Sequence, residues 1–373
     1  MDTRIYLDYN ATTPLRPQAR EELMRVLGAP HNASSVHGFG REARKIVEDA
    51  RTQVATLVGA PVNQVIFNSG ATEGNNTVLH HFKDDRILVS AIEHPSVLEA
   101  APHAERIPVT KDGLVDLEAL EKLLKEKTGL VSVMLVNNET GVIQPLAEIS
   151  ALAKRHGALV HSDAVQAAGK IPLDIAALGI DFLTLSAHKI GGPQGAGALV
   201  LGLCGITPVL LHGGGQEKKA RGGTENVAAI AGFGIAAHMA KKEMDQYQKI
   251  SALRDRLEKE IQKISPEIII HAKNAPRVAN TSLFSLPGAK SETMLMAFDL
   301  EGICLSNGSA CSSGRVEASH VLKAMGAPDD QAKSALRVSM GWNTTPAEID
   351  RFLEIWSKLY DRFKDKIKAK SHA

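Results

Sequence analysis

The sequence predicts an α/β protein, with a large domain built on a mostly parallel β-sheet flanked by helices and a smaller α+β domain. Short apolar runs that end in polar or glycine residues alternate with amphipathic helical stretches, a pattern typical of buried parallel strands. After residue 240 the pattern changes to a charged helical stretch, short strands and a final helix. The length of 373 residues suits one large and one smaller domain, because a domain takes about 150 residues.

Five apolar runs are the expected strands of the large domain. They span residues 65–67, 87–89, 130–136, 158–160 and 182–185. Helices are expected between them, for example at residues 117–124 and 145–152. We place the large domain at residues 13–250 and the small domain at residues 1–12 and 251–373. Ligands bind beyond the carboxyl ends of strands in open α/β sheets, so the polar residues that follow the five runs should converge on one site.

Composition excludes several classes of protein. Lys and Arg number 43 and Asp and Glu 42, so the formal net charge of +1 provides no field that attracts a nucleic acid. The apolar tract at residues 227–240 is too short for a membrane span, and we expect a buried helix there. The 3 cysteines cannot form a disulfide framework, and the first residues lack the pattern of a signal peptide. We therefore expect a cytoplasmic protein that binds neither nucleic acid nor membrane.

Two charged residues follow expected strands and point to chemistry. Lys189, in the run Ser-Ala-His-Lys-Ile-Gly-Gly-Pro, lies between an apolar strand and a glycine-rich loop. Partial desolvation there would free its amine to act as a nucleophile. The alternative is a lysine that extends from a strand end to solvent. Asp163 could hold the protonated ring nitrogen of a pyridoxal phosphate (PLP) cofactor, or it could cap a helix.

Two further motifs suit the binding of a phosphorylated ring. Residues 69–76, Ser-Gly-Ala-Thr-Glu-Gly-Asn-Asn, place small residues at a strand-to-helix turn, where exposed backbone N–H groups bind phosphate. Taken alone, an ordinary capped turn explains this run as well. His94 follows another expected strand and could stack on a ring or relay protons, or serve a structural purpose. No spacing of His, Cys or carboxylate residues suits a metal ion, so we expect no metal site.

Cys311 lies in the polar run at residues 306–314, Ser-Asn-Gly-Ser-Ala-Cys-Ser-Ser-Gly. This composition is typical of a mobile loop, which suits a nucleophile better than a structural thiol. Structural cysteines sit among apolar neighbours. Cys204 and Cys304 have such neighbours, and we expect both in the core.

Taken together, these motifs resemble the class V aminotransferase-like PLP enzymes of fold type I, and among them the NifS/IscS-type cysteine desulfurases. The likeness covers nearly the whole chain, and many motifs in the same order are far more specific than any one of them. The markers are residues 6–13, 69–76, 136–141, 163–166, 186–189, 213–217, 221–226 and 308–311.

The resemblance implies a role for each matching residue. Lys189 is similar to the lysine that links covalently to PLP and carries the Cα proton. Asp163 is similar to the partner of the ring nitrogen, Gln166 to the partner of the ring oxygen, and His94 to the histidine that stacks on the ring. A phosphate cradle is implied at Ala71, Thr72, Ser186 and His188. Thr224 resembles a threonine that reaches the phosphate of the other subunit, which implies a homodimer.

The resemblance also implies a substrate and a reaction. Asn138 and Arg337 are similar to groups that hold the substrate carboxylate, with help from Asn10; Arg suits this role because its fork binds a carboxylate through two bonds. L-Cysteine would be converted to L-alanine. Cys311 would take the sulfur as a persulfide and pass it to an acceptor, such as an iron–sulfur scaffold protein.

The chain departs from the family pattern at three positions: Ala33 and Gly222 replace residues that are commoner there, and Trp342 stands where Arg is commoner. Two alternatives remain open. One is a selenocysteine lyase or an aminotransferase on the same fold. The other is a catalytically silent protein that serves as a sulfur carrier or scaffold partner, although the joint presence of Lys189, Asp163 and Cys311 argues against it.

Overall fold

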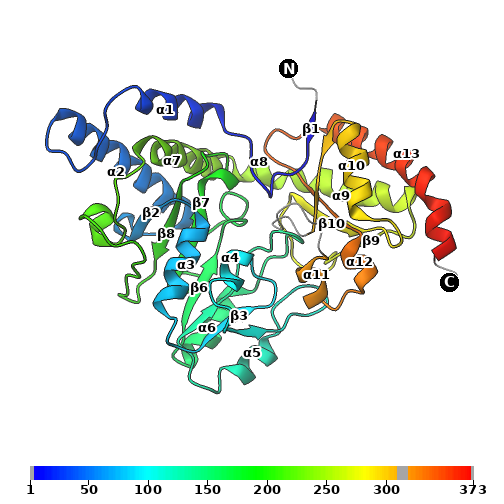
Figure 1. The fold of residues 1–373 in the computed structure, drawn as a ribbon, viewed down its shortest axis with the longest axis horizontal. Helices are drawn as coiled ribbons and strands as arrows, with labels where there is room; N and C mark the ends of the chain where they lie inside the picture. The colour runs from blue at the N-terminus through cyan, green and yellow to red at the C-terminus, as the bar shows by residue number, and fades with distance from the viewer. Residues whose placement is uncertain (1–3, 309–317, 371–373) are drawn as a thin grey trace.

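The computed structural model describes residues 4–308 and 318–370. The chain forms two groups of secondary structure that lie side by side, one around a seven-stranded sheet and a smaller one around a four-stranded sheet (Figure 1). In the described part of the chain, no helix combines the length and the apolar character needed to cross a membrane.

The large sheet has the strand order β2-β8-β7-β6-β5-β3-β4. β8 runs antiparallel to both of its neighbours, and the remaining pairs are parallel, so the prediction of a mostly parallel sheet is confirmed. All five expected runs contribute a strand. The strands are β2 (Val65–Asn68), β3 (Ile87–Ser90), β4 (Glu105–Ile107), β5 (Leu130–Ser132), β6 (Leu159–Asp163), β7 (Phe182–Ser186) and β8 (Gly197–Leu201).

β5 is shorter than the apolar run at residues 130–136 that predicts it. Beyond Ser132 the chain keeps hydrogen bonds to the β6 segment through the amides of Val133 and Leu135. The amide between them, Met134 N, instead donates to a carboxyl oxygen of Glu93 at 2.7 Å. A buried side chain therefore takes the place that a neighbouring strand would occupy.

Helices cover both faces of the large sheet, because successive residues of a strand point to opposite sides. In β7, Phe182 packs in a cluster with Val78 and Leu79 of α3, whereas Leu183 belongs to the cluster that includes α2 and α7. α7 packs against α1 and α2 and is buried along most of its length, as predicted for residues 227–240. These elements are α1 (Pro17–Leu27), α2 (Gly38–Val58), η1 (Val62–Gln64), α3 (Ala71–His81), α4 (Pro95–Leu98), α5 (Leu117–Leu123), α6 (Leu146–Arg155), η2 (Ala187–Lys189), η3 (Gln216–Lys219) and α7 (Val227–Lys242).

The smaller group contains an antiparallel sheet with the order β12-β13-β10-β9. Its core is aromatic: Trp356 stacks with Phe298 and Phe352 and meets Phe284 edge-on. The strands are β9 (Ile269–Ile270), β10 (Thr281–Ser285), β11 (Ile303–Cys304), β12 (Ser306–Asn307) and β13 (Ala335–Ser339). The helices are α8 (Met244–Gln248), α9 (Ile250–Ile264), α10 (Ser291–Leu300), α11 (His320–Ala324), α12 (Asp329–Lys333) and α13 (Pro346–Lys370).

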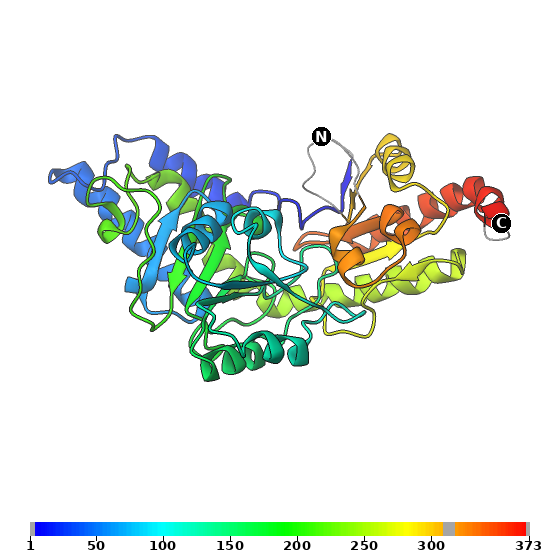
Figure 2. The same ribbon diagram turned by 60° about the horizontal axis from the view of Figure 1, so that its bottom comes forward.

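The N-terminal segment packs with the smaller group although it precedes the large sheet in sequence. β1 (Ile5–Tyr6) lies beside the smaller group (Figure 2) and pairs in parallel with β11. Leu7 is buried in the same core as Trp356. Residues 250–359 supply the rest of this core. The domain boundaries at residues 12/13 and 250/251 stay predictions.

The charged helical stretch expected at residues 241–264 is divided into the end of α7, α8 and α9. The division has a packing reason. Met244 is buried in the core of the large sheet, whereas Ile250 is buried in the core of the smaller group. The chain therefore turns between these residues so that each apolar side chain reaches its own core.

Candidate active site

A cavity of about 520 Å³ lies at the carboxyl ends of the parallel strands. The residues around it come from the N-terminal segment, from the ends of β6 and β7, from the start of α3 and from β13. The structure therefore brings together motifs that are distant in sequence, as the strand-end argument predicts.

Lys189 reaches the cavity from the short helix that directly follows β7. Its Nζ donates hydrogen bonds to the backbone oxygens of Asn10, at 2.6 Å, and Ala11, at 2.8 Å. The N-terminal segment therefore holds the amine at the cavity, and the residue is half-buried. The role of this amine in the chemistry stays a prediction.

Asp163 ends β6 and is buried. Its Oδ1 accepts from Val165 N at 3.0 Å, so the side chain also stabilises the turn that follows the strand. Its Oδ2 accepts from Asn75 Nδ2 at 2.8 Å. Asn75 also donates to Ser96 Oγ, which lies 2.8 Å from His94 Nδ1. A chain of hydrogen bonds thus links the carboxylate to His94, which lines the same cavity.

Two histidines of the cavity favour the neutral form. Burial lowers the pKa of His94 below its usual value, and the charge of Lys189 lowers it further against the pull of Asp163. Burial, followed by the charge of Lys189, lowers the pKa of His188 to about 4. A neutral imidazole can lie flat against a ring without carrying charge into the cavity.

The start of α3 forms a seat for an anion. Gly70 precedes the helix with a φ of 152°, a backbone angle that favours glycine. The helix then begins at Ala71 and Thr72, whose backbone N–H groups belong to the helix N-terminus, where such groups lack partners within the helix. Ser186 and His188 line the same cavity, and a Cβ added at Gly70 would lie 3.9 Å from Ser186 Oγ. All four predicted cradle residues therefore border one cavity, and their contact with a phosphate stays a prediction.

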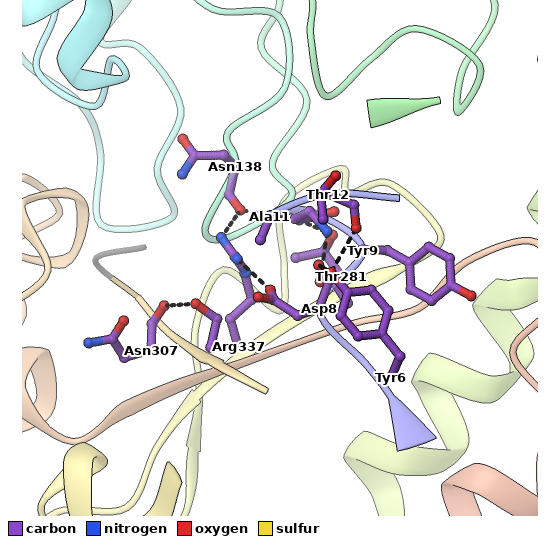
Figure 3. Close-up of polar contacts among 12 residues, drawn as sticks. Tyr6, Asp8, Tyr9, Ala11, Thr12, Asn138, Thr281, Asn307 and Arg337 are labelled. Carbon is purple, nitrogen blue, oxygen red and sulfur yellow. Dashed lines mark hydrogen bonds and ion pairs between the residues drawn. The ribbon is translucent and has the colours of Figure 1, made fainter. Parts of the chain in front are cut away.

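Arg337 also lines the cavity, from β13 of the smaller group, and is buried; Figure 3 shows its polar contacts. One terminal nitrogen donates to Asp8 Oδ1 at 2.7 Å, and the other donates to the backbone oxygen of Asn138 at 3.0 Å. Its Nε is buried without a hydrogen-bond partner among the described residues. Each terminal nitrogen keeps a second N–H group, so the guanidinium of this cavity-lining residue can still donate to an incoming carboxylate.

Asn10 and Asn138 both line the cavity, but their side chains differ in freedom. The amide nitrogen of Asn10 already donates to Asn138 O at 3.1 Å and to Thr281 Oγ1 at 2.9 Å. Asn10 therefore fixes the backbone that carries Asn138. Its direct part in holding a substrate stays a prediction.

One predicted residue of the described part of the chain lies outside this cavity. Thr224 lines a neighbouring cavity of about 230 Å³, which shares Ser69 and Gly195 with the first. Cys311 lies outside the described residues. The segments that flank it meet at Glu139: Ser319 Oγ donates to the Glu139 carboxyl at 2.5 Å, and a Cβ added at Gly308 would lie 2.8 Å from Glu139 Oε2.

Three buried ionisable residues near the cavity were not singled out from the sequence: Glu93, Glu139 and Lys170. Burial raises the pKa of Glu93 and of Glu139 to about 8. Burial and the charges of Lys189 and Arg337 lower the pKa of Lys170 well below its usual value. Glu93 directly precedes His94 and Glu139 directly follows Asn138, so position next to a site residue was the available signal.

Among residues 4–308 and 318–370, no group of three or more His, Cys, Asp or Glu side chains comes together as metal ligands. Cys204 and Cys304 are half-buried rather than fully buried, so the expectation that both lie inside the core is only partly met.

The fold and the comparisons with known proteins place the chain in a family of PLP-dependent enzymes. The model of the family described as Aminotransferase class-V matches residues 5–352, and the chain belongs to this family. The chain is similar to the cysteine desulfurase IscS of Dictyoglomus turgidum, with 38% identity over 379 residues that cover 98% of this chain and 96% of the relative. It is 40% identical over 376 residues to a cysteine desulfurase of Cereibacter sphaeroides, with 97% of each chain covered.

A solved structure leads to the same group within the family. The NifS-like protein from Rickettsia africae is 41% identical, with a TM-score of 0.90 and coverage of 96% of this chain and 99% of that one. The resemblance to NifS/IscS-type cysteine desulfurases is therefore confirmed.

Proposed function

We propose that this chain is a PLP-dependent cysteine desulfurase that converts L-cysteine to L-alanine and takes the sulfur as a persulfide on Cys311. The observation that carries the proposal is the meeting of Lys189, Asp163, the start of α3 and Arg337 around one cavity. Relatives named cysteine desulfurase, which match almost the whole chain, support the same activity.

The residues of the cavity fit PLP. The helix N-terminus at Ala71 and Thr72, together with Ser186 and His188, would hold the phosphate. Asp163 would hold the ring nitrogen, and Lys189 would supply the covalent link. When bound, PLP supplies an electron sink that stabilises negative charge at the substrate Cα.

Gln166 and His94 would complete the ring site. The amide of Gln166 lines the cavity and would donate to the ring oxygen, and the neutral imidazole of His94 would stack on the ring.

The protein's own groups bind the substrate and move its protons. Arg337 would receive the carboxylate of L-cysteine through the remaining N–H groups of its terminal nitrogens, with Asn138 beside it. The amine of Lys189 would accept the proton from the substrate Cα. Arg337 and Asp163 are themselves buried, and low exposure to water strengthens the interactions of their charges.

Cys311 would receive the sulfur. Its thiolate attacks the substrate sulfur, an S–S bond forms, and the Cβ–S bond breaks. The electron pair of the broken bond stays with the carbon skeleton, which takes up protons and leaves as alanine. The described residues that flank the Cys311 segment, Gly308 and Ser319, lie against Glu139, one residue from Asn138 in the cavity.

We also propose a homodimer in which Thr224 serves the partner's phosphate site. The position of Thr224 in a cavity adjacent to the first supports this arrangement. A sulfur-acceptor protein, such as an iron–sulfur scaffold, would remove the persulfide sulfur. The cytoplasmic location and the absence of nucleic-acid or membrane partners stay predictions of the sequence.

The test is to load the purified protein with PLP and measure alanine and sulfide formed from L-cysteine in the presence of a thiol reductant. We expect both products in equal amounts. Lys189→Ala should lose the visible absorption band of the lysine-linked cofactor and the activity, whereas Lys154→Ala, on the exposed surface of α6, should retain both. Formation of both products by Lys189→Ala would refute the assignment of the lysine.

The same preparation separates the alternatives. Selenocysteine as a strongly preferred substrate would indicate a lyase for that amino acid, and amino-group exchange to a keto acid would indicate an aminotransferase. A wild-type protein without a visible band would indicate a catalytically silent partner protein.

A further inference from the structure

Lys170 is a buried lysine behind the wall of the cavity. Only 4% of its surface is exposed, and burial is the first cause that lowers its pKa. No Asp or Glu of the described residues forms an ion pair with it, and the nearby charges that act on it are the cations Lys189 and Arg337. A lysine in such a place costs stability unless its N–H groups are satisfied.

The amine of Lys170 is satisfied by two side-chain amides. Its Nζ donates to Gln166 Oε1 at 2.5 Å and to Asn10 Oδ1 at 3.0 Å. Even an uncharged amine keeps two N–H groups, one for each of these oxygens. The orientation of Asn10 is fixed independently, because its Nδ2 donates to the backbone oxygen of Asn138, which can only accept.

The two ends of the Gln166 amide are thereby fixed. The end that faces Lys170 Nζ is the oxygen, and the other end donates from Nε2 to the backbone oxygen of Asn10 at 2.9 Å. The amide nitrogen carries a second N–H group, and Gln166 lines the same cavity as Asp163 and Lys189. Without the amine of Lys170, the amide oxygen would lose its partner, and only the bond from Nε2 to Asn10 O would hold the amide in this orientation.

We propose that Lys170 is a positioning residue of the cofactor site, whose buried amine holds the Gln166 amide so that an N–H group, not an oxygen, faces the ring oxygen of PLP. The inference rests on the proposed function, because it needs PLP in this cavity. A donor stabilises the anionic ring oxygen, whereas an amide oxygen would repel it. The proton shared between that oxygen and the lysine linkage is held less tightly when a donor is present.

The test is the pH midpoint at which the visible absorption band of the PLP-loaded protein changes. Four proteins are compared: wild type, Lys170→Met, Gln166→Ala and the double variant. Loss of one hydrogen bond to a charged oxygen should raise the midpoint in Lys170→Met by about one pH unit. The double variant should show no further rise over Gln166→Ala, because residues that act through one contact are not additive.

Controls separate positioning from other effects. Lys154→Met, at an exposed position of α6, should leave the midpoint unchanged. A thermal melt verifies the fold of each variant. If Lys170→Met does not fold, Lys170→Gln replaces it, and its rise should likewise occur only when Gln166 is present.

Two results would overturn this inference and leave the proposed function standing. One is an unchanged midpoint in Lys170→Met. The other is an equal rise with and without Gln166, which would show that the lysine charge acts directly. A wild-type protein that takes up no PLP would overturn the proposed function as well.

Discussion

Replacing Glu139 by Gln should remove a large part of the pH dependence of stability. Glu139 is fully buried, and its pKa is raised from 4.5 to about 8 because burial disfavours the charged form; a hydrogen bond from Ser319 and the charge of Arg337 oppose this only in part. The folded protein therefore keeps a proton on Glu139 that the unfolded chain releases. The contribution of the neutral Glu139 carboxyl to the free energy of unfolding is complete below pH 4.5 and is lost as the pH rises through about 8.

The size of the effect follows from the shift. Each pH unit between the two pKa values lowers the free energy of unfolding by about 1.4 kcal/mol, so Glu139 should cost about 2 kcal/mol between about pH 6 and about pH 7.5. Glu93 has the same raised pKa and acts in the same direction. The buried histidines His161, His188 and His271, with pKa values of about 4, act in the opposite direction as the pH rises toward 6.5.

The assay is urea unfolding of the wild type, of Glu139→Gln and of a control, Glu148→Gln, at both pH values. Glu148 is exposed on α6. The other groups contribute equally to all three proteins, so they cancel in the comparison. Between the two pH values, the free energy of unfolding should fall by about 2 kcal/mol less in Glu139→Gln than in the wild type. In Glu148→Gln it should fall as much as in the wild type. Equal losses in all three would refute the buried, protonated state of Glu139.

Three further predictions concern other buried contacts. Arg337→Lys keeps the charge but loses the fork, and should raise the KM for L-cysteine at least about tenfold with a smaller change in kcat; an unchanged KM would contradict its role in binding the carboxylate. Asn75→Ala removes the donor to Asp163 and should lower the free energy of unfolding, measured in urea, by about 2 kcal/mol; no loss would show that this bond is unimportant. Arg51→Met leaves the carboxylate of Glu217 buried without its bidentate partner and should cost about 3–5 kcal/mol. Addition of Glu217→Gln should recover part of that loss, and a single variant as stable as the wild type would contradict the account.

Much of the site could be predicted because it lies at strand ends. Lys189, Asp163 and His94 each follow an apolar run, and a parallel sheet brings the ends of such runs together whatever their separation in sequence. The start of α3 could be predicted for the same reason. Arg337 is different, because it lies on β13 of the smaller sheet, and only the resemblance to a family indicated it.

The features that escaped prediction depend on contacts between distant segments. Lys170 resembles any lysine after a turn until the fold places Asn10 beside it. Glu139 becomes informative only when Ser319 meets it. The early end of β5 likewise depends on Glu93, which replaces a strand neighbour at Met134. Periodicity and motif spacing carry no information about such partners.

The most direct test of the central claim is mass spectrometry of Cys311 after the PLP-loaded protein has reacted with L-cysteine carrying an isotopically labelled sulfur. The account predicts one labelled sulfur on Cys311 and an equal amount of alanine, with the same result when Cys204 or Cys304 is replaced by Ser. Alanine formed while Cys311 carries no labelled sulfur, or undiminished sulfur transfer by Cys311→Ala, would contradict it.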